Sequence, residues 1–332
     1  ILDNHKVIPY TLIMINRRVV DDLLKKITEK KKKLDGYRPL STELVKNLDD
    51  WFRVELTYTS NAIEGNTLTR SETALVVEKG ITVNGKTFIE HLEAINHAEA
   101  IDFIKELVKS KSRGIKERDV LDIHSKILKK IDDKNAGRYR TVGVRIQGAT
   151  VVLPNPLKVP ELMADFYKWL RSKKSDHPAK IGADAHLKLV TIHPFADGNG
   201  RTARLLLNLI LIQAGYPPAL IRKSDRKVYI DSIAKAQSEG SSDDYYEVVY
   251  KAVNRSLDIY LEGLNPQTDK GRKIMSGQKQ LLRIGELAQE ARETVVTIRH
   301  WTEKGLLEVA DHTEKGYQLY DRSMIERARE IR

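Results

Sequence analysis

The residues best suited to chemistry lie in one run, His193–Arg204, with the sequence HPFADGNGRTAR. His193 can serve as a base, and Pro194 disfavours helical geometry in the residue before it, so this histidine is expected at a helix end. Asp197 is the only carboxylate of the run. Carboxylate oxygens are the protein ligands that Mg²⁺ prefers. The first half of the run therefore predicts a base beside a cation ligand.

The second half of the run suits a phosphate group. Gly198 and Gly200 let the backbone approach a ligand without a side chain in the way. A long apolar helix is expected to start near Thr202, and the N-terminus of such a helix attracts anions. Arg201 and Arg204 add fixed positive charge and paired donors for phosphate oxygens. Together these twelve residues predict a site for phosphoryl or nucleotidyl transfer.

The run His193–Arg204 resembles the signature of Fic domains, which transfer AMP from ATP to a hydroxyl group of a target protein. The similarity extends to Gly137–Arg140 and Ala214–Pro218 and covers roughly residues 50–260. The resemblance implies that His193 takes the proton from a serine, threonine or tyrosine hydroxyl and that Asp197 holds Mg²⁺. It also implies that five residues bind the phosphates so that pyrophosphate can leave: Gly198, Asn199, Gly200, Arg201 and Arg204.

Gly200 bears on the choice between two reactions. The related Doc-type kinases carry lysine at this position and bind the nucleotide in the inverted orientation, so Gly200 favours adenylyl over phosphoryl transfer. A phosphodiester hydrolase that removes AMP with the same site is an alternative, and a nucleotide-sensing DNA-binding regulator is another. His186, seven residues before His193, suggests a metal pair, but on an apolar helix this spacing more often means core packing.

The pattern changes from helical to alternating between residues 138 and 156. Apolar residues alternate from Val142, Gly148 interrupts the run, and it resumes before Leu153, which predicts a β-hairpin. The resemblance identifies Val142–Leu153 as the flap on which a segment of the target protein would dock by strand addition; a purely structural hairpin is the alternative. The resemblance also implies further nucleotide contacts, at Ile146, Gln147, Gly148, Ala149, Tyr229 and Gln237.

A second informative run, Ser60–Asn66 (SNAIEGN), precedes the core. By itself it reads as a helix end with Gly65 as the left-handed stop and Glu64 as a solvated acid. It also resembles the inhibitory motif of Fic proteins whose inhibitory helix precedes the core, in which Ser60, Glu64 and Gly65 are the motif residues. The resemblance implies that Glu64 pairs with Arg204 and leaves ATP in an unproductive pose. In some relatives the same glutamate supports the removal of AMP by positioning water.

The last part of the chain predicts a separate small unit. Residues 281–332 resemble the winged helix-turn-helix of MerR-like regulators, on Thr297–Leu307 and Gly316–Tyr320. Such modules place their second helix in the major groove, so Arg299 and Lys304 are candidate DNA contacts. These residues carry nine Lys/Arg against ten Asp/Glu, which is unfavourable for attraction to phosphates. Because Gln318 also replaces the usual arginine, docking of a protein or formation of a homodimer is the alternative.

These sites must be positioned by a mainly α-helical chain. The apolar periodicity predicts helices at Val19–Lys32, Leu44–Ala62, Ser71–Lys79, Phe88–Val108, Arg118–Ile131, Val159–Ser172, Ala179–Ile192, Thr202–Ala214, Val228–Gln237 and Asp243–Leu261. The resemblance implies a Fic fold, a helical bundle around a central helix pair with a β-hairpin flap. We expect an N-terminal helical region at 1–110, the catalytic core at 111–261, a linker at 262–280 and the winged helix-turn-helix at 281–332.

Composition sets the remaining limits. With 41% hydrophobic and 31% charged residues the chain is typical of a globular protein. The absence of cysteine excludes disulfides, thiol nucleophiles and thiolate metal sites. We expect no secretory signal, no membrane partner and a cytoplasmic location. The net charge of +11 suits a protein that holds ATP and Mg²⁺, and the run Lys30–Lys33 is interpreted as a solvated helix face.

Overall fold

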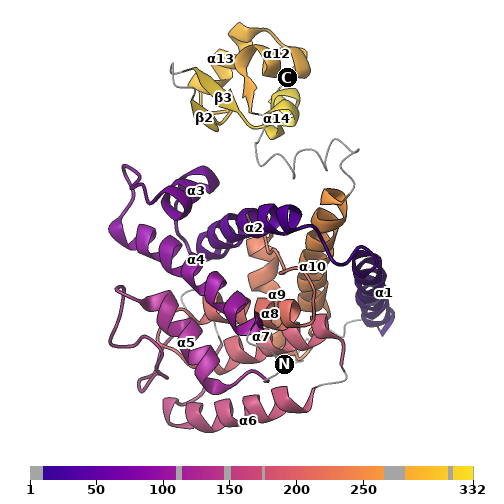
Figure 1. Ribbon diagram of the computed structural model, residues 1–332, viewed down its shortest axis with the longest axis vertical. Helices are drawn as coiled ribbons and strands as arrows, with labels where there is room; N and C mark the ends of the chain where they lie inside the picture. Colours follow the sequence, from indigo (N-terminus) through magenta and orange to yellow (C-terminus); the bar gives the residue numbers. More distant parts are fainter. Residues whose placement is uncertain are drawn as a thin grey trace, which may run out of the picture. The chain divides into compact units, whose positions relative to one another are not determined.

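The computed structural model describes residues 10–109, 114–145, 151–173, 176–264, 281–312 and 317–331. The chain divides into two compact units, Ile1–Leu261 and Glu262–Arg332, each with its own core. Both units are dominated by helices, which confirms the mainly α class (Figure 1).

The larger unit is a helical bundle (Figure 1). Its α-helices are α1 (Tyr10–Asp35), α2 (Thr42–Ile63), α3 (Arg70–Lys79), α4 (Phe88–Lys109), α5 (Glu117–Leu128), α6 (Val159–Ser172), α7 (Pro178–Ile192), α8 (Asn199–Gln213), α9 (Arg226–Glu239) and α10 (Asp243–Gly263). Short 3₁₀ turns at Pro156–Lys158 and Lys223–Asp225 precede α6 and α9. Most of these helices agree with the predicted ranges to within about three residues, since the apolar stripe that defines each helix is also the face that it buries.

Helices α7 and α8 form the central pair of the bundle. Helix α8 is buried from Arg201 to Leu211, as expected for a helix that is apolar on all sides. The two helices approach closely at Gly182, where an added Cβ would lie 2.6 Å from Cδ1 of Leu207. A glycine at this crossing therefore allows the close approach, and the loop 193–198 joins two closely packed helices.

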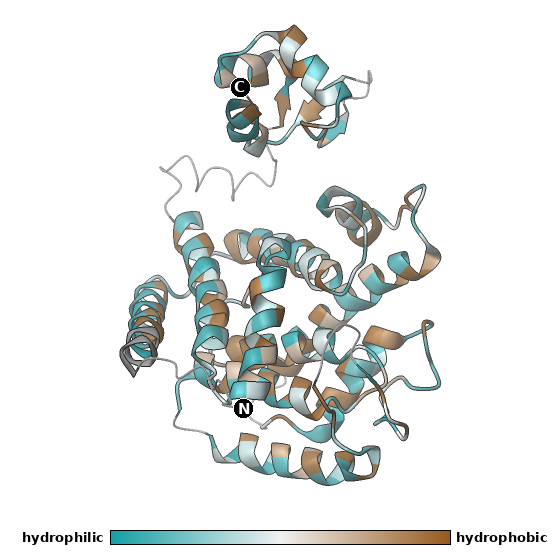
Figure 2. Cartoon of the chain, turned by 180° about the vertical axis from the view of Figure 1, so that it is seen from behind, coloured by the Kyte–Doolittle hydropathy of each residue, from teal (hydrophilic) through white to brown (hydrophobic). Residues whose placement is uncertain are grey.

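The other helices surround the central pair. Helices α4 and α5 pack on α8, α6 packs on α7, and α2 packs on α4. Helix α1 is tied to α10 by an ion pair between Lys30 Nζ and Asp258 Oδ1 at 2.5 Å. Figure 2 shows hydrophilic and hydrophobic residues alternating around the outer helices, as expected when each helix turns one face to the core.

Three predicted helix boundaries differ from those in the structure, two of them for a local reason. Helix α8 begins at Asn199 rather than Thr202, because Gly198 adopts the left-handed conformation (φ 74°) as its N-cap. Helix α5 ends at Leu128, before Lys130 turns into the left-handed region (φ 61°). Helix α1 begins at Tyr10, nine residues before the predicted start.

The predicted flap lies partly outside the described residues, which do not include 146–150. The flanking residues 142–145 and 151–155 are described, and no regular strand is assigned to them. The described part of the flap therefore consists of two chain segments without regular secondary structure.

The smaller unit contains the predicted helix-turn-helix, α12 (Ile284–Ala291) and α13 (Val295–Glu303), followed by α14 (Ser323–Ile331). Its antiparallel sheet has the order β1–β3–β2, from Leu282–Arg283, Asp311–His312 and Gln318–Tyr320. Leu282 pairs with Tyr320, and Asp311 pairs with Leu319. The short strand β1, which pairs with β3, was not predicted from the sequence. Leu287, Ile298 and Tyr320 lie in a core that belongs to this unit alone.

Among the described residues, no helix has both the length and the apolar character needed to cross a membrane.

The close crossing of α7 and α8 gives a first prediction. The substitution Gly182→Val places a branched side chain where even a Cβ lies 2.6 Å from the buried Leu207. We expect it to destabilise the larger unit by about 2 kcal/mol or more through overpacking. Thermal unfolding followed by circular dichroism measures the change. Ala164→Val, at an exposed position of α6, is the matched control, and an equal fall in melting temperature for both variants would contradict the prediction.

Candidate active site

The loop between α7 and α8 begins with an unusual backbone conformation. His193 ends α7 with φ 51° and ψ 59°, in the left-handed region that residues other than glycine rarely adopt. Its own N–H still bonds to the carbonyl of Leu189 at 2.9 Å. On the other side, Arg140 Nε donates to the His193 carbonyl at 2.8 Å, and the Arg140 N–H donates to the Pro194 carbonyl at 2.8 Å. These bonds offset the cost of the strained turn and fix the direction of the His193 side chain.

Arg140 also joins the loop to the base of the flap. Its Nη1 donates to the carbonyl of Val142 at 3.2 Å, and its Nη2 donates to the carbonyl of Pro154 at 2.7 Å. The residue is buried, and burial lowers the pKa of its guanidinium. One cation therefore holds both sides of the flap and the start of the loop. The sequence resemblance included Arg140 but did not indicate this role.

The His193 imidazole is set up to accept a proton. Its Nδ1 lies 3.3 Å from the carbonyl of Val190, and because a carbonyl only accepts, this contact places the ring proton on Nδ1 and leaves Nε2 free. Burial lowers the pKa of His193, the Val190 carbonyl opposes this, and Arg140 lowers it further. The ring is therefore neutral at pH 7, as a general base requires.

A second histidine, which the sequence did not single out, supports the loop from α5. His124 stacks on Phe195 with ring centroids 3.7 Å apart. Its Nε2–H donates to the carbonyl of Asp197 at 3.0 Å, and its Nδ1 accepts from the N–H of Gly137 at 2.9 Å. Burial lowers the pKa of His124 to about 4, so the ring stays neutral and keeps both bonds at physiological pH. A lone histidine on a helix carries no local sequence signal of such a role.

Asn199 closes the loop internally. Its side-chain oxygen accepts from the Phe195 N–H and its Nδ2 donates to the Phe195 carbonyl, both at 2.9 Å. Both polar atoms of the Asn199 side chain are occupied by Phe195, so only the backbone N–H of Asn199 can donate to a ligand. The first N–H groups of α8, after the N-cap Gly198, have no carbonyl of a preceding helical turn to bind. Free N–H groups at a helix N-terminus attract anions, and these groups lie where the sequence predicts a phosphate.

The structure brings Glu64 and Arg204 together, as the resemblance implies. Glu64 Oε1 lies 2.6 Å from Arg204 Nη2, while Ser60 accepts from Arg204 through its hydroxyl and its carbonyl, both at 3.0 Å. Burial would lower the pKa of Arg204, but the Glu64 carboxylate and the Tyr229 hydroxyl together raise it. A Cβ on Gly200 would overlap Glu64 Oε1 in its present position. Glu64 therefore lies directly over the N-terminus of α8, in the space that the absence of a side chain at Gly200 leaves open.

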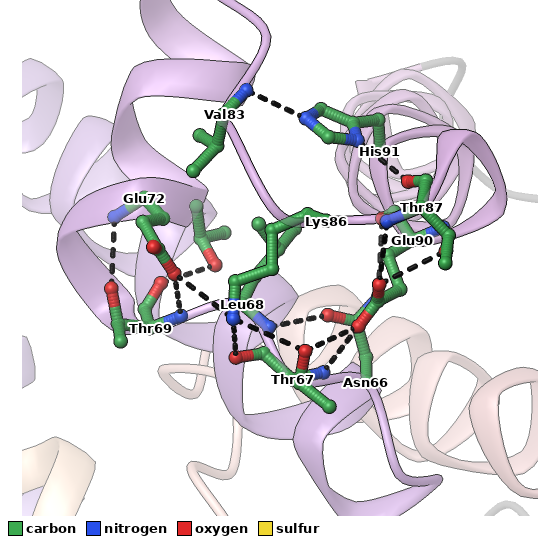
Figure 3. A network of polar contacts seen from close by, with 11 residues as sticks. Asn66, Thr67, Leu68, Thr69, Glu72, Val83, Lys86, Thr87, Glu90 and His91 are labelled. Carbon is green, nitrogen blue, oxygen red and sulfur yellow. Dashed lines mark hydrogen bonds and ion pairs between the residues drawn. The ribbon is translucent and has the colours of Figure 1, made fainter.

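The chain segment after Glu64 is clamped to α4 by the polar network in Figure 3. The Glu90 carboxylate accepts hydrogen bonds from the N–H and hydroxyl groups of Thr67 and Thr87, and these bonds lower its pKa to about 2. Asn66 Nδ2 donates to the carbonyl of Glu90 at 3.1 Å. Gly65 lies between, with φ 105°, a conformation that favours glycine. The end of α2, and with it Glu64, is thus held in place by α4.

The other arginine of the loop is also paired. Arg201 Nη2 donates to Asp197 Oδ2 at 3.0 Å, and Arg201 Nη1 donates to Glu93 Oε1 at 2.8 Å. Arg201 is only 3% exposed, whereas the Asp197 side chain is 68% exposed. Asp197 can therefore exchange Arg201 for another cation, while Arg201 remains inside the protein.

Tyr229 lies behind Arg204 rather than on the open side of the site. It is 1% exposed, and its hydroxyl lies 2.6 Å from His186 Nε2. His186 Nδ1 in turn lies 2.8 Å from the Tyr245 hydroxyl, which donates to the carbonyl of Ala183. Burial lowers the pKa of His186 to about 3. Both ring nitrogens of His186 are occupied, so it is a packed core residue and not half of a metal pair.

Gln237 lies in a different environment from Tyr229. Its Nε2 donates to the Thr191 hydroxyl at 3.2 Å. Gln237 and Thr191 line a cleft of about 510 Å³ between α6, α7 and α9, whose apolar wall includes Phe166 and Trp169. Tyr229 is not among the lining residues of this cleft. The remaining predicted nucleotide contacts, Ile146, Gln147, Gly148 and Ala149, lie outside the described residues.

Asp197 fits a magnesium ion that arrives with its nucleotide. Among the described residues, no group of three or more histidine, aspartate or glutamate side chains could hold a metal ion. Mg²⁺ usually needs only one or two protein carboxylates, because phosphates and water complete its coordination. An exposed carboxylate next to a helix N-terminus meets that need.

Comparison with known proteins agrees with this geometry. The Fic/DOC family profile matches residues 114–211, and the MerR HTH family regulatory protein profile matches residues 282–332. A Protein adenylyltransferase Fic from Nematostella vectensis is 37% identical over 247 residues, which are 74% of this chain and 57% of that protein. Fic-1 from C. elegans is similar with a TM-score of 0.69 and 31% identity, over 76% of this chain and 74% of that chain. A Fic domain containing signaling protein from Bacteroides thetaiotaomicron has a TM-score of 0.66 and 27% identity, over 74% of this chain and 99% of that chain.

The bundle around α7 and α8, with its HPFADGNGRTAR loop, defines a Fic fold. The chain belongs to the Fic/DOC family, and its smaller unit is a MerR-type helix-turn-helix domain. The chain spans just over half of the curated relative, 57% of its length.

The buried position of His193 gives a second prediction. Because its pKa is lowered from the ordinary value of 6.5, the ring should take up a proton only below pH 6.5. The neutral ring stabilises the fold fully above pH 6.5, and this contribution is lost as the pH falls through the lowered pKa. Titration of the histidine Cε1–H resonances by NMR measures the midpoint, with the His193→Gln spectrum identifying the resonance. A midpoint at or above 6.5 would contradict the prediction.

Proposed function

We propose that this protein is a protein adenylyltransferase that moves AMP from ATP to a serine, threonine or tyrosine hydroxyl of a target protein, and that Glu64 restrains it. The observation that carries the proposal is the loop 193–204. In it a neutral His193 is followed by the N-terminus of α8 and by Arg204, which can together bind an anion. The names of the curated relatives, Protein adenylyltransferase Fic, support the same activity.

The proposed reaction follows from what these residues can do. His193 Nε2 accepts the proton of the target hydroxyl, whose oxygen forms a bond to the α-phosphorus of ATP. The bond between the α-phosphorus and the oxygen that bridges to the β-phosphorus breaks, and pyrophosphate leaves. The N–H groups at the start of α8, after Gly198, bind the phosphate oxygens and stabilise the charge that builds up on them. Arg204 and Arg201 complete the cradle.

Asp197 would hold Mg²⁺ on the phosphates, and the ion would neutralise charge on the departing pyrophosphate. Asp197 is suited to this because its backbone carbonyl is fixed by His124 while its carboxylate stays exposed. The flap, anchored by Arg140 to the same loop, would align the target segment.

Glu64 is proposed to restrain the enzyme by taking the place of a phosphate. Its carboxylate lies over the helix N-terminus beside Gly200 and binds the guanidinium of Arg204. A carboxylate at a helix N-terminus is stabilised by the same N–H groups and dipole that would bind a phosphate oxygen. ATP therefore competes with Glu64 for Arg204, and its outer phosphates cannot settle in the productive position.

Incubation with α-³²P-labelled ATP, Mg²⁺ and cell lysate tests this proposal. We expect Glu64→Gly to raise protein labelling by about tenfold or more, because the variant frees Arg204 at the cost of one charge-assisted bond. The double variant Glu64→Gly/His193→Ala should show no label, because the base is lost. Glu78→Gly removes an exposed acid on α3 and is the matched control. Labelling that survives the loss of His193 would refute its role, and equal labelling by parent and Glu64→Gly would refute the restraint.

We propose DNA binding as a second activity, carried by the smaller unit. Its MerR-type family match supports this, as do Arg299 and Lys304, which are exposed on and just after α13. Helix α13 starts at the N-cap Thr294, whose hydroxyl accepts from the Thr297 N–H at 3.1 Å. It corresponds to the helix that such modules insert into the major groove.

Filter binding of random duplex DNA at several salt concentrations tests the second activity. We expect binding that weakens as salt rises, and a further loss in Arg299→Ala/Lys304→Ala, because each lost phosphate contact lowers the salt slope by about one. Arg327→Ala, an exposed arginine of α14, is the control. Absence of binding at low salt would refute this second activity and leave docking of a protein or formation of a homodimer as the alternative.

A further inference from the structure

Glu93 on α4 connects two parts of the site that are far apart in the sequence. Its Oε1 accepts from Arg201 Nη1 at 2.8 Å, and its Oε2 accepts from Asn66 Nδ2 at 2.8 Å. Its backbone carbonyl accepts from Asn61 Nδ2 at 3.1 Å. The Glu93 side chain is 18% exposed. A single carboxylate thus binds the catalytic loop on one side and the end of α2 on the other.

We infer that Glu93 is the positioning residue of Arg201: it holds this arginine for the phosphates and ties it to the segment that carries Glu64. The inference rests on the proposed function and adds to it a residue outside the family's loop and inhibitory motif.

The burial of Arg201 makes such a partner necessary. Arg201 is 3% exposed, and its Nε has no partner among the described residues. A buried cation that loses all its carboxylate partners strongly destabilises the folded protein, so Arg201 must keep either Asp197 or Glu93. When the exposed Asp197 turns to the cation of the nucleotide, Glu93 is the carboxylate that stays. Arg201 Nη2, which Asp197 releases, then has an N–H group free to donate on the side of the loop.

Glu93 and Glu64 bind different arginines from different elements. Glu93 binds Arg201 from α4, and Glu64 binds Arg204 from the end of α2. The atoms nearest to the Cβ position of Gly200 belong to Glu64 and Arg204, so Glu64 occupies the anion site itself. Glu93 instead makes its contacts from α4, next to Asn66. Removal of Glu93 should therefore misplace Arg201 rather than vacate a phosphate position.

The position of Glu93 also couples the two arginines. Asn61 and Asn66 lie on either side of Glu64, and both bond to Glu93. Movement of the α2 terminus that takes Glu64 from Arg204 therefore changes the support of Arg201 as well.

The test compares Glu64→Gly/Glu93→Ala with Glu64→Gly/Glu106→Ala. Glu106 is an exposed glutamate near the C-terminal end of the same helix α4, so it is a matched control. Calorimetric binding of α,β-methylene-ATP with Mg²⁺ gives Kd, and AMP transfer from ATP gives kcat and KM. We expect Glu93→Ala to raise Kd and KM by about tenfold, the size of one charge-assisted hydrogen bond. The Glu106 variant should match Glu64→Gly alone.

Glu64→Gly/Glu93→Gln keeps the volume and one acceptor oxygen, so it should fold and show a smaller rise in Kd, of about threefold. Melting temperatures establish that each variant is folded. Tighter nucleotide binding or faster transfer on loss of Glu93 would overturn the inference, because Glu93 would then compete with the nucleotide. Equal Kd values for the Glu93 and Glu106 variants would also overturn it. Failure of the proposed function is seen separately, as absence of transfer by Glu64→Gly itself.

Discussion

The burial of Arg204 is the constraint on which the rest of the site depends. This guanidinium is 6% exposed, and a buried cation must have partners or destabilise the fold by several kcal/mol. Ser60 and Glu64, both from the end of α2, supply them. A nucleotide that uses Arg204 must therefore replace a carboxylate that the protein already provides. On the proposed function, the resting enzyme is stable for the same reason that it is restrained.

The loop itself owes its geometry to residues outside it. Its left-handed turn at His193 is bonded from outside by Arg140, and its centre is packed and hydrogen-bonded by His124. Helices α7 and α8 fix its two ends at the close crossing of Gly182 and Leu207. These contacts from three different elements hold His193, Asp197 and the start of α8 at a fixed spacing. Preorganisation of this kind is what electrostatic stabilisation of a transition state requires.

The N-terminal helices α2 and α4 contribute residues to the site. Each arginine of the loop has a carboxylate from this region, Glu64 of α2 for Arg204 and Glu93 of α4 for Arg201. The polar network around Glu90 clamps the end of α2 to α4 (Figure 3). This agrees with the division of the chain, in which one compact unit contains both these helices and the loop. The smaller unit, by contrast, has an independent core.

The sequence by itself determined the local features. The order of apolar residues predicted nearly every helix, and the run from His193 to Arg204 predicted the turn between α7 and α8, because both depend on neighbours along the chain. Tertiary structure decided which distant groups meet. His124, Arg140 and Glu93 reach the loop from other elements, and Tyr229 lies inside the core although its sequence position suggested a nucleotide contact. Such contacts depend on how each helix is rotated and packed, and a single polar residue carries no periodic signal of its partner.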